Sequence, residues 1–377
     1  MRVLLAEDSA ASRFLLRRAV EELGHDCVVA EDGEQAWGIF REGGVEVVIS
    51  DWIMPGIDGD ELCRRIRADD AAPYTYFVML TSLEDKEHVL RGMQAGVDDY
   101  LTKPLDRNDL KARLIAASRV TALHQQILEQ QRELNSEVAM AAGIQRGLLP
   151  AAPPTVPGAG VSGWCLPAAN VGGDYYDLLL DAEGRLTLLI ADVAGHSIGS
   201  ALLMAMARSV LRREASQGAG PAAVLDATNR AMYSDLVNAG LFITIFCARY
   251  TPADGVLVYA NAGHNPPFVL RGGGSVEQLD ADGAAVGFLP DVAFEERECA
   301  LAPGEALLLY TDGVVEAPDG AGEQFGEERL AERATAARGE SAEQLVAAIV
   351  AAVDGYTGGG NQHDDVTLVA LRREEAT

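Results

Sequence analysis

The sequence predicts two folded domains of different class, an α/β domain followed by an α+β domain, with a long helix between them. In the first third of the chain, apolar runs alternate with segments of helical period, which is typical of a doubly wound parallel sheet of five strands. Residues 106–149 contain no proline and mostly helix-forming residues. After Pro150, apolar runs follow one another without regular helical alternation, which indicates antiparallel sheets flanked by helices. We therefore expect the first domain at residues 1–120, a helical connector at 107–149 and the second domain at 150–377.

Each element of the first domain has its own pattern. The expected strands lie in "RVLLAEDS", "CVVA", "VEVVISD", "YFVMLTS" and "DDYLTKP", whose apolar runs suit strands that are covered on both faces. The expected helices lie at residues 12–23 and in "GEQAWGIFRE", "GDELCRRIRA" and "KEHVLRGMQAG". In such a sheet, ligand sites lie beyond the carboxyl ends of the strands.

The composition limits the classes of function. The chain has 377 residues, with 30 Lys and Arg against 57 Asp and Glu, and a net charge of -27. Because so acidic a surface repels nucleic-acid phosphates and anionic lipids, we expect neither nucleic acid nor a membrane as a partner. The five cysteines show no CxxC spacing, and the N-terminus lacks the pattern of a signal peptide. We therefore expect reduced thiols and a cytoplasmic location.

Five polar side chains follow the expected strands of the first domain: Glu7, Asp8, Asp51, Thr81 and Lys103. Clustered carboxylates suit a Mg2+ ion, which neutralises an incoming phosphoryl group. One carboxylate can attack phosphorus and become an aspartyl phosphate, and lysine and threonine can then bond to the new phosphate oxygens. The alternative, that each acid only caps a loop, leaves the shared position of all five at strand ends unexplained.

The segments "AEDS", "SDWIMPGIDG", "LTS" and "YLTKP" closely resemble the receiver domains of response regulators. The resemblance implies that Asp51 is the phosphoacceptor and that a sensor histidine kinase is a partner. It also implies a cis peptide bond between Lys103 and Pro104. The residues implied for Mg2+ are Glu7, Asp8, Asp51 and, through its backbone carbonyl, Ile53; those implied for the switch are Thr81, Lys103 and Tyr100.

The connector carries a partial heptad repeat. One column, which is apolar, contains Val120, Ile127, Leu134, Ala141 and Leu148. The other column, which is mostly polar, contains His124, Gln131, Val138 and Gln145. We expect a parallel homodimer through a coiled coil of marginal stability, because a half-polar seam is weak. The alternative is an amphipathic helix that packs on its own domain.

Aspartates stand at the ends of several expected strands and turns of the second domain: Asp174, Asp192, Asp312, Asp364 and Asp365. They can meet only if the fold gathers these ends. Several carboxylates without a clustered His or Cys ligand set suit hard cations such as Mg2+ or Mn2+ rather than structural zinc.

The stretch Gly172-Gly173-Asp174 by itself leaves three interpretations open. It can belong to a GGDEF-type nucleotide cyclase, supply a metal-binding carboxylate of a phosphatase, or form a turn without chemistry. The tyrosines Tyr175 and Tyr176 stand where a cyclase needs acidic and aromatic residues. A cyclase also leaves "TDG" and "DDVT" without a role, so the phosphatase interpretation is favoured.

The set "GGDYYD", "ADVAGH", "AGHNPP", "TDGVVEA" and "DDVT" resembles the PPM-type serine/threonine phosphatases, in the SpoIIE-like bacterial branch of sporulation and general-stress phosphatases. The resemblance implies a β-sandwich of two antiparallel sheets flanked by helices and two Mn2+ or Mg2+ ions. The implied metal ligands are Asp192 as the bridge with the Val193 carbonyl, Asp312 and Asp364 on one ion, and Asp174 on the other, with Asp365 behind them. A metal-bound water then attacks phosphorus, so no protein nucleophile is needed.

Three polar residues near these acids have alternative roles. His196 and His264 can protonate the leaving oxygen, although a structural role is favoured for a loop histidine. Ser197 stands where the family usually has glycine and is expected to cap the next helix.

Together these features predict a two-component response regulator whose output is the metal-dependent dephosphorylation of a phosphoserine or phosphothreonine protein. The resemblance implies an anti-anti-sigma protein of STAS type as the substrate and control through phosphorylation of Asp51. One alternative is a receiver-gated pseudo-phosphatase that only binds its partner, which does not account for the retained aspartates. Another, a DNA-binding regulator, conflicts with the acidic charge.

Overall fold

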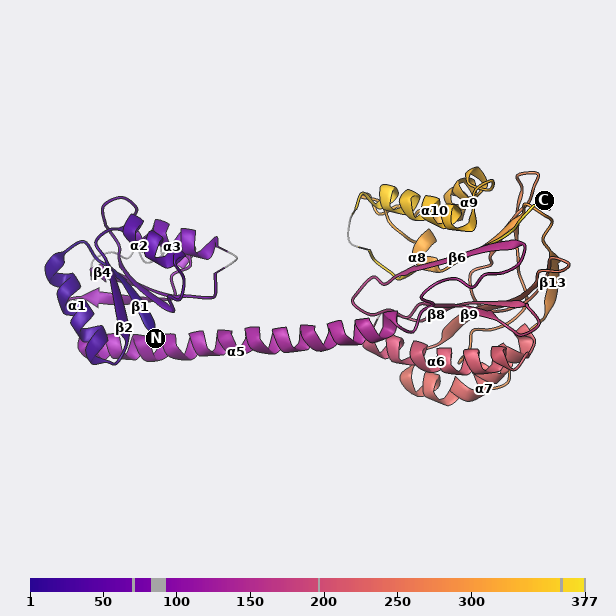
Figure 1. Ribbon diagram of the computed structural model, residues 1–377. Coiled ribbons are helices and arrows are strands. Elements are labelled where there is room, and N and C mark those ends of the chain that lie inside the picture. The colour runs from indigo at the N-terminus through magenta and orange to yellow at the C-terminus, as the bar shows by residue number, and fades with distance from the viewer. Residues whose placement is uncertain (70–71, 83–92, 196, 360–361, 376–377) are drawn as a thin grey trace. The chain divides into compact units, whose positions relative to one another are not determined.

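The structure is a computed structural model and describes residues 1–69, 72–82, 93–195, 197–359 and 362–375. It contains two compact units, Met1–Asn135 and Ser136–Thr377, and the division between them falls inside one long helix, α5 (Figure 1). Each unit has its own sheets and core.

The first unit is a five-stranded parallel sheet in the order β2-β1-β3-β4-β5, as predicted. Its elements are β1 (Arg2–Ala6), α1 (Ala10–Glu22), β2 (Asp26–Ala30), α2 (Gly33–Arg41), β3 (Val47–Asp51), α3 (Gly59–Arg67), β4 (Tyr76–Ser82), β5 (Asp99–Lys103) and the start of α5 (Arg107–Arg146). One core lies between the sheet and helices α2 and α3, and the other lies between the sheet and helices α1 and α5. The helix expected in "KEHVLRGMQAG" lies largely outside the described residues.

Helix α1 begins two residues earlier than its apolar period indicates. Ser9 is its N-cap, and the Ser9 hydroxyl accepts a hydrogen bond from the backbone N–H of Ser12. A capping side chain satisfies an N–H group that has no partner inside the helix, so the helix begins where the cap stands.

The second unit is a sandwich of two antiparallel sheets, in the orders β13-β10-β9-β8-β7 and β12-β11-β14-β15-β6. The strands are β6 (Ala159–Leu166), β7 (Tyr175–Leu180), β8 (Leu186–Val193), β9 (Ile243–Thr251), β10 (Val256–Ala262), β11 (Phe268–Leu270), β12 (Val276–Gln278), β13 (Arg297–Ala300), β14 (Ala306–Tyr310) and β15 (Val366–Arg373). The helices are α6 (Ile198–Ser216), α7 (Pro221–Ala239), α8 (Asp312–Val315), α9 (Gly326–Ala336) and α10 (Ala342–Thr357).

Burial of apolar side chains organises this second unit into four layers. One core lies between the two sheets, and it includes Phe246 and Leu309, which are fully buried. A second core lies between the first sheet and helices α6 and α7, and a third lies between the other sheet and helices α8–α10. Figure 1 shows these two groups of helices on opposite sides of the sandwich. The architecture is the flanked β-sandwich that the sequence resemblance implies.

Helix α5 runs without a break from the first unit into the second unit, and its predicted heptad column has two kinds of contact. Val120 packs against the core of the first unit, and Leu148, just beyond the helix, packs against the second unit. Ile127 and Leu134 are exposed by 44% and 58%. The interpretation as a helix packed on its own domain is therefore correct for the ends of the column, and only its middle remains available for a coiled-coil seam.

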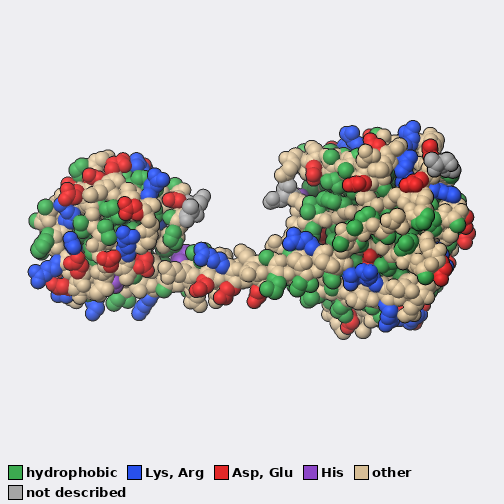
Figure 2. Space-filling view, in the orientation of Figure 1, with side chains coloured by type: hydrophobic (Ala, Val, Ile, Leu, Met, Phe, Trp, Pro, Cys, Tyr) green, Lys and Arg blue, Asp and Glu red, His purple; other side chains and the backbone are tan. Residues whose placement is uncertain are grey.

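The charged side chains are mixed over the surface. On the face that Figure 2 shows, basic side chains are scattered among acidic ones rather than gathered in one area. None of the described helices combines the length and the apolar character needed to cross a membrane.

Candidate functional site

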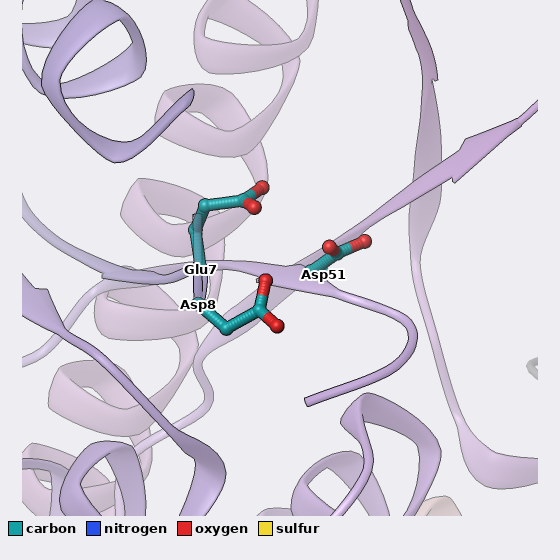
Figure 3. Close-up of side chains that lie close together, drawn as sticks. All are labelled: Glu7, Asp8 and Asp51. Atoms are coloured by element: carbon teal, nitrogen blue, oxygen red, sulfur yellow. The ribbon is translucent and has the colours of Figure 1, made fainter. Parts of the chain in front are cut away.

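The first candidate site is an acidic cluster at the carboxyl edge of the parallel sheet. Glu7 and Asp8 follow β1, and Asp51 ends β3, which is the neighbour of β1 in the sheet. Their carboxylates offer oxygens that lie within 4.8 Å of one another (Figure 3). Three carboxylates of this kind are the donor set that a Mg2+ ion prefers, so the residues present fit the ion that the sequence resemblance implies.

Lys103 joins this cluster from the end of β5. Its Nζ lies 2.7 Å from Oδ2 of Asp51 and 2.9 Å from Oε2 of Glu7. Burial raises the pKa of Glu7, and the hydrogen bond from Lys103 only partly opposes this effect. Burial lowers the pKa of Lys103, but the bonds to Asp51 and Glu7 outweigh it, so the pKa of Lys103 is raised. The lysine is thus a permanent cation beside the predicted phosphoacceptor.

The structure also places the other residues that the resemblance to receiver domains implies. Thr81 is nearly buried at the end of β4, one residue beyond Leu80, which pairs with Asp51. Tyr100 is half-buried on β5 and packs against one core of the sheet. The Ile53 side chain is exposed, and the peptide bond between Lys103 and Pro104 is cis, as expected.

The second candidate site lies at one end of the sandwich, where the five aspartates that the sequence analysis singled out in this unit converge. Asp174 precedes β7 and Asp192 lies near the end of β8, and these two strands pair with Tyr175 opposite Ala191. Strand β14 is followed by Thr311, which is the N-cap of α8, and Asp312 is the first residue of that helix. Asp364 and Asp365 precede β15, the neighbour of β14.

A hydrogen bond links the two sheets at this end. The Thr311 hydroxyl donates to Oδ2 of Asp174 at 2.9 Å, and it accepts the backbone N–H of Thr367 at 2.9 Å. All three residues are buried. Thr311 therefore fixes the Asp174 carboxylate of one sheet to the end of the other sheet. Sequence reasoning quoted Thr311 only as part of "TDG" and gave it no role.

These carboxylates lie close enough for their charges to act on one another. Burial, followed by the charges of Asp312, Asp364 and Asp365, raises the pKa of Asp192 to about 7. The pKa of Asp174 is raised well above its usual value, first by burial and then by the charge of Asp192. Like-charged groups that are held together in this way are stabilised by cations. The donor set is all oxygen, so it fits Mn2+ or Mg2+. Among the described residues, no three of these acids bring oxygens within 4.8 Å, so they span a wider space than the receiver cluster does.

Asp365 holds the turn that carries Asp174. Its carboxylate accepts the backbone N–H groups of Ala168 at 2.8 Å, Gly173 at 2.6 Å and Asp174 at 3.4 Å. A Cβ on Gly172 would lie 2.3 Å from Oδ2 of Asp365, and a Cβ on Gly173 would lie 2.4 Å from the Val193 carbonyl oxygen. The two glycines are therefore required by the close approach of other groups at the acidic site.

His264 and Ser197 have structural roles. His264 is buried, its Nδ1 is 2.9 Å from the Thr244 hydroxyl, and its Nε2 is 3.1 Å from the Tyr310 carbonyl oxygen. Burial lowers the pKa of His264 to about 4, so the ring is a neutral core group, and the alternative role as a proton donor is not supported. Ser197 caps α6, as expected, by accepting the N–H of Ser200 at 3.2 Å. His196 lies outside the described residues.

The sequence analysis placed Gln145 in the polar heptad column and assigned it no role at the second site. In the structure, its side chain forms hydrogen bonds with Gly172 of that site. The side-chain Nε2 donates to the Gly172 carbonyl oxygen at 2.6 Å, and Oε1 accepts the Gly172 N–H at 3.0 Å. Its polar character in a column that should be apolar was the available signal.

Comparison with known proteins identifies a family for each of the two units. The family model for stage II sporulation protein E (SpoIIE) matches residues 182–374, and the model for the response regulator receiver domain matches residues 3–115. Asp174 lies before residue 182, where the SpoIIE match begins.

Relatives resemble the second unit in sequence and fold. The phosphoserine phosphatase RsbU of Bacillus subtilis is 31% identical over 254 residues, which cover 67% of this chain and 74% of RsbU. The protein IcfG of Synechocystis is 31% identical over 61% of this chain, but the match covers only 40% of IcfG. The SiaA-PP2C domain of Pseudomonas aeruginosa is 28% identical with a TM-score of 0.57, covering 64% of this chain and 98% of that domain. The chain therefore belongs to the SpoIIE family of PP2C-type serine/threonine phosphatases, and it carries a response regulator receiver domain.

Proposed function

We propose that the protein is a metal-dependent phosphatase of a phosphoserine or phosphothreonine protein. The observation that carries the proposal is the convergence of five aspartates, with raised pKa values at Asp174, Asp192 and Asp312, at one end of the sandwich. Two Mn2+ or Mg2+ ions, when bound, supply an activated water for attack on phosphorus. The metal ligands that we propose are Asp174, Asp192, the Val193 carbonyl, Asp312 and Asp364, with Asp365 supporting the turn.

The remaining groups of the site position these ligands. Thr311 holds one oxygen of Asp174, and the Asp365 carboxylate holds the backbone on either side of Gly173. These bonds restrict the carboxylate to one orientation, which lowers the cost of assembling a ligand set. His264 keeps β9 and β14 at a fixed spacing through Thr244 and Tyr310 rather than taking part in proton transfer.

We further propose that the receiver controls this phosphatase. A sensor histidine kinase supplies the phosphoryl group to Asp51, and Thr81, Lys103 and Tyr100 respond to it. The substrate that we propose is an anti-anti-sigma protein of STAS type, as the sequence resemblance implies. The similarity to the phosphoserine phosphatase RsbU supports a phosphoserine substrate. A parallel homodimer through the middle of α5, where Ile127 and Leu134 are exposed, completes the proposal.

The deciding experiment is hydrolysis of a phosphoserine-containing STAS protein by the purified full-length chain. The reaction is followed with Mn2+, with EDTA, and with Mn2+ plus acetyl phosphate. We expect release of inorganic phosphate with Mn2+, none with EDTA, and a changed rate with acetyl phosphate. Binding of the phosphoprotein without release of phosphate would instead identify a pseudo-phosphatase.

Phosphorylation at Asp51 is expected to add one phosphoryl group when the protein is incubated with acetyl phosphate and Mg2+. The Asp51 carboxylate lies beside Glu7, Asp8 and the Lys103 ammonium, which together suit a cation and a phosphoryl group. Intact-mass measurement detects the adduct. Asp51→Asn should remove it, whereas Asp58→Asn, at a nearby exposed position, should keep it. Equal labelling of the Asp51→Asn variant would rule out the assignment.

Replacement of Gly173 by alanine is expected to weaken Mn2+ binding by at least about 10-fold, the scale on which groups behind metal ligands act. The new Cβ would lie 2.4 Å from the Val193 carbonyl oxygen, so the turn that carries Asp174 must shift. The matched control is Gly272→Ala, because a Cβ there has no atom within 4 Å. Isothermal titration with Mn2+ measures both variants, and equal affinities for the two would contradict the proposed ligand set.

A further inference from the structure

One side chain near the C-terminal end of α5, that of Gln145, forms hydrogen bonds with the second site. Gln145 forms two hydrogen bonds with Gly172, one to its carbonyl oxygen at 2.6 Å and one from its N–H at 3.0 Å. Both backbone polar groups of one residue are thus bonded to one amide side chain. Such a pair fixes the position and the rotation of the peptide backbone, because both bonds must keep their geometry at once.

The residue that is held stands two positions before Asp174. The next two backbone N–H groups, of Gly173 and Asp174, both donate to Oδ2 of Asp365. The turn is therefore held from two sides, by Gln145 at its first residue and by Asp365 at the next two. Glycines have no side chain to pack and the largest backbone freedom, so such a turn depends on hydrogen bonds from its surroundings.

The space beside the turn is hollow rather than packed. A cavity of about 310 Å3 lies between the end of α5 and the turn, and its walls include Ala142, Gln145, Gly172, Asp174 and Asp365. Side chains that line a cavity have fewer contacts to hold them. The two hydrogen bonds of Gln145 cross from the helix to the turn at the edge of this cavity.

We propose that Gln145 is a positioning residue for the metal ligand Asp174, so that the placement of α5 sets the metal affinity of the phosphatase site. The inference rests on the proposed function in one respect, namely that Asp174 is a metal ligand. A shift of the helix by one residue breaks both bonds together, since both belong to one side chain. The turn then loses the group that fixes Gly172, and the Asp174 carboxylate loses its fixed orientation.

The test is Mn2+ binding by the full-length protein with Gln145→Met, a helix-forming replacement of similar length that forms neither hydrogen bond. Gln125→Met is the matched control, because Gln125 is exposed on the same helix, outside both heptad columns, and has no hydrogen-bond partner among the described residues. Isothermal titration is carried out on each variant. The Asp192→Ala variant keeps the receiver site intact, so its titration measures the Mn2+ binding of the receiver alone. This binding is subtracted from the titration of each other variant.

We expect Gln145→Met to weaken Mn2+ binding at the phosphatase site by about 10-fold, as is usual for groups that orient metal ligands. Excess Mn2+ should restore most of the turnover, and Gln125→Met should match the wild type. The metal-free urea midpoints of all three proteins should agree, and amide exchange should be faster over residues 170–176 in Gln145→Met alone.

An unchanged Mn2+ affinity in Gln145→Met would overturn the inference. If the urea midpoint of that variant also fell, Gln145 would be a purely structural contact. If Gln145→Met does not fold, Gln145→Ala is measured in the same way. Binding requires no turnover, so a wild type that binds Mn2+ but hydrolyses no phosphoprotein would refute the proposed function and still decide this inference.

Discussion

Replacing Asp192 with asparagine is expected to abolish two-metal binding and to lower turnover by at least about 100-fold, the loss seen when a single group that stabilises developing charge is removed. Asp192 lies near the end of β8, and the charges of Asp312, Asp364 and Asp365 act on it together with burial to raise its pKa to about 7. Asparagine has the same shape but no charge, so it is a much weaker ligand for a hard cation.

The same substitution should leave the metal-free protein folded, with an unfolding temperature no lower than that of the wild type, because it removes like-charge repulsion. Asp291→Asn, at an exposed surface position, is the control and should change neither property. Asp174→Asn should be milder, and excess Mn2+ should recover part of its rate. Wild-type turnover in the Asp192→Asn variant would refute the proposed two-metal mechanism.

Deleting seven residues of α5, Gln125–Gln131, is expected to preserve the response to acetyl phosphate, whereas deleting the four residues Gln125–Leu128 should lock the rate high or low. Seven residues complete one heptad and keep Leu134 in the column of Val120, while four residues move it out. The deletions begin after His124, because the His124 ring stacks on the Tyr74 ring with their centroids 4.1 Å apart. This contact holds that part of α5 against the first unit.

The measured quantity is the ratio of phosphatase rates with and without the phosphodonor. In the wild type we expect a ratio on the order of fivefold or more, the usual scale of coupling between sites. The seven-residue deletion should keep that ratio, and the four-residue deletion should bring it to one. Equal ratios for both deletions would show that the signal does not travel through the phase of the helix.

Within the sandwich, the sequence predicts the central strands better than the edge strands. The apolar runs "RLTLLIADVA", "LFITIFCARYT", "GVLVYANAG", "EALLLYTDG" and "VTLVALR" indicate the central strands β8, β9, β10, β14 and β15, and the runs of the first domain indicate every strand of the parallel sheet. No such run indicates the four edges of the sandwich, β13, β7, β12 and β6, or the three-residue strand β11. An edge strand has one side without a neighbour, so its sequence need not be continuously apolar. The segment "RECA" of β13 is an example.

The candidate site was predictable to the extent that its chemistry resides in acids at strand ends. The structure gathers Asp174, Asp192, Asp312, Asp364 and Asp365 at one end of the sandwich, as the sequence interpretation required. The bonds of Thr311 to Asp174 and of Gln145 to Gly172 were not predictable, because they join segments 137 and 27 residues apart. Such pairs depend on how the two sheets and helix α5 pack against one another, which local sequence patterns do not predict.

The salt bridges of Lys103 give the two metal sites opposite chemistry in the absence of metal. In the receiver, the single charge of the Lys103 ammonium already offsets part of the negative charge of Glu7 and Asp51 before Mg2+ binds. At the phosphatase site, no ion pair joins a Lys or Arg to Asp192, Asp312 or Asp364 in the ranges that the structure describes, and the raised pKa of Asp192 lets it hold a proton near neutral pH. We therefore expect metal binding there to release protons, so a calorimetric titration in buffers of different ionisation enthalpy should show a larger buffer-dependent heat for the phosphatase ions than for the receiver ion.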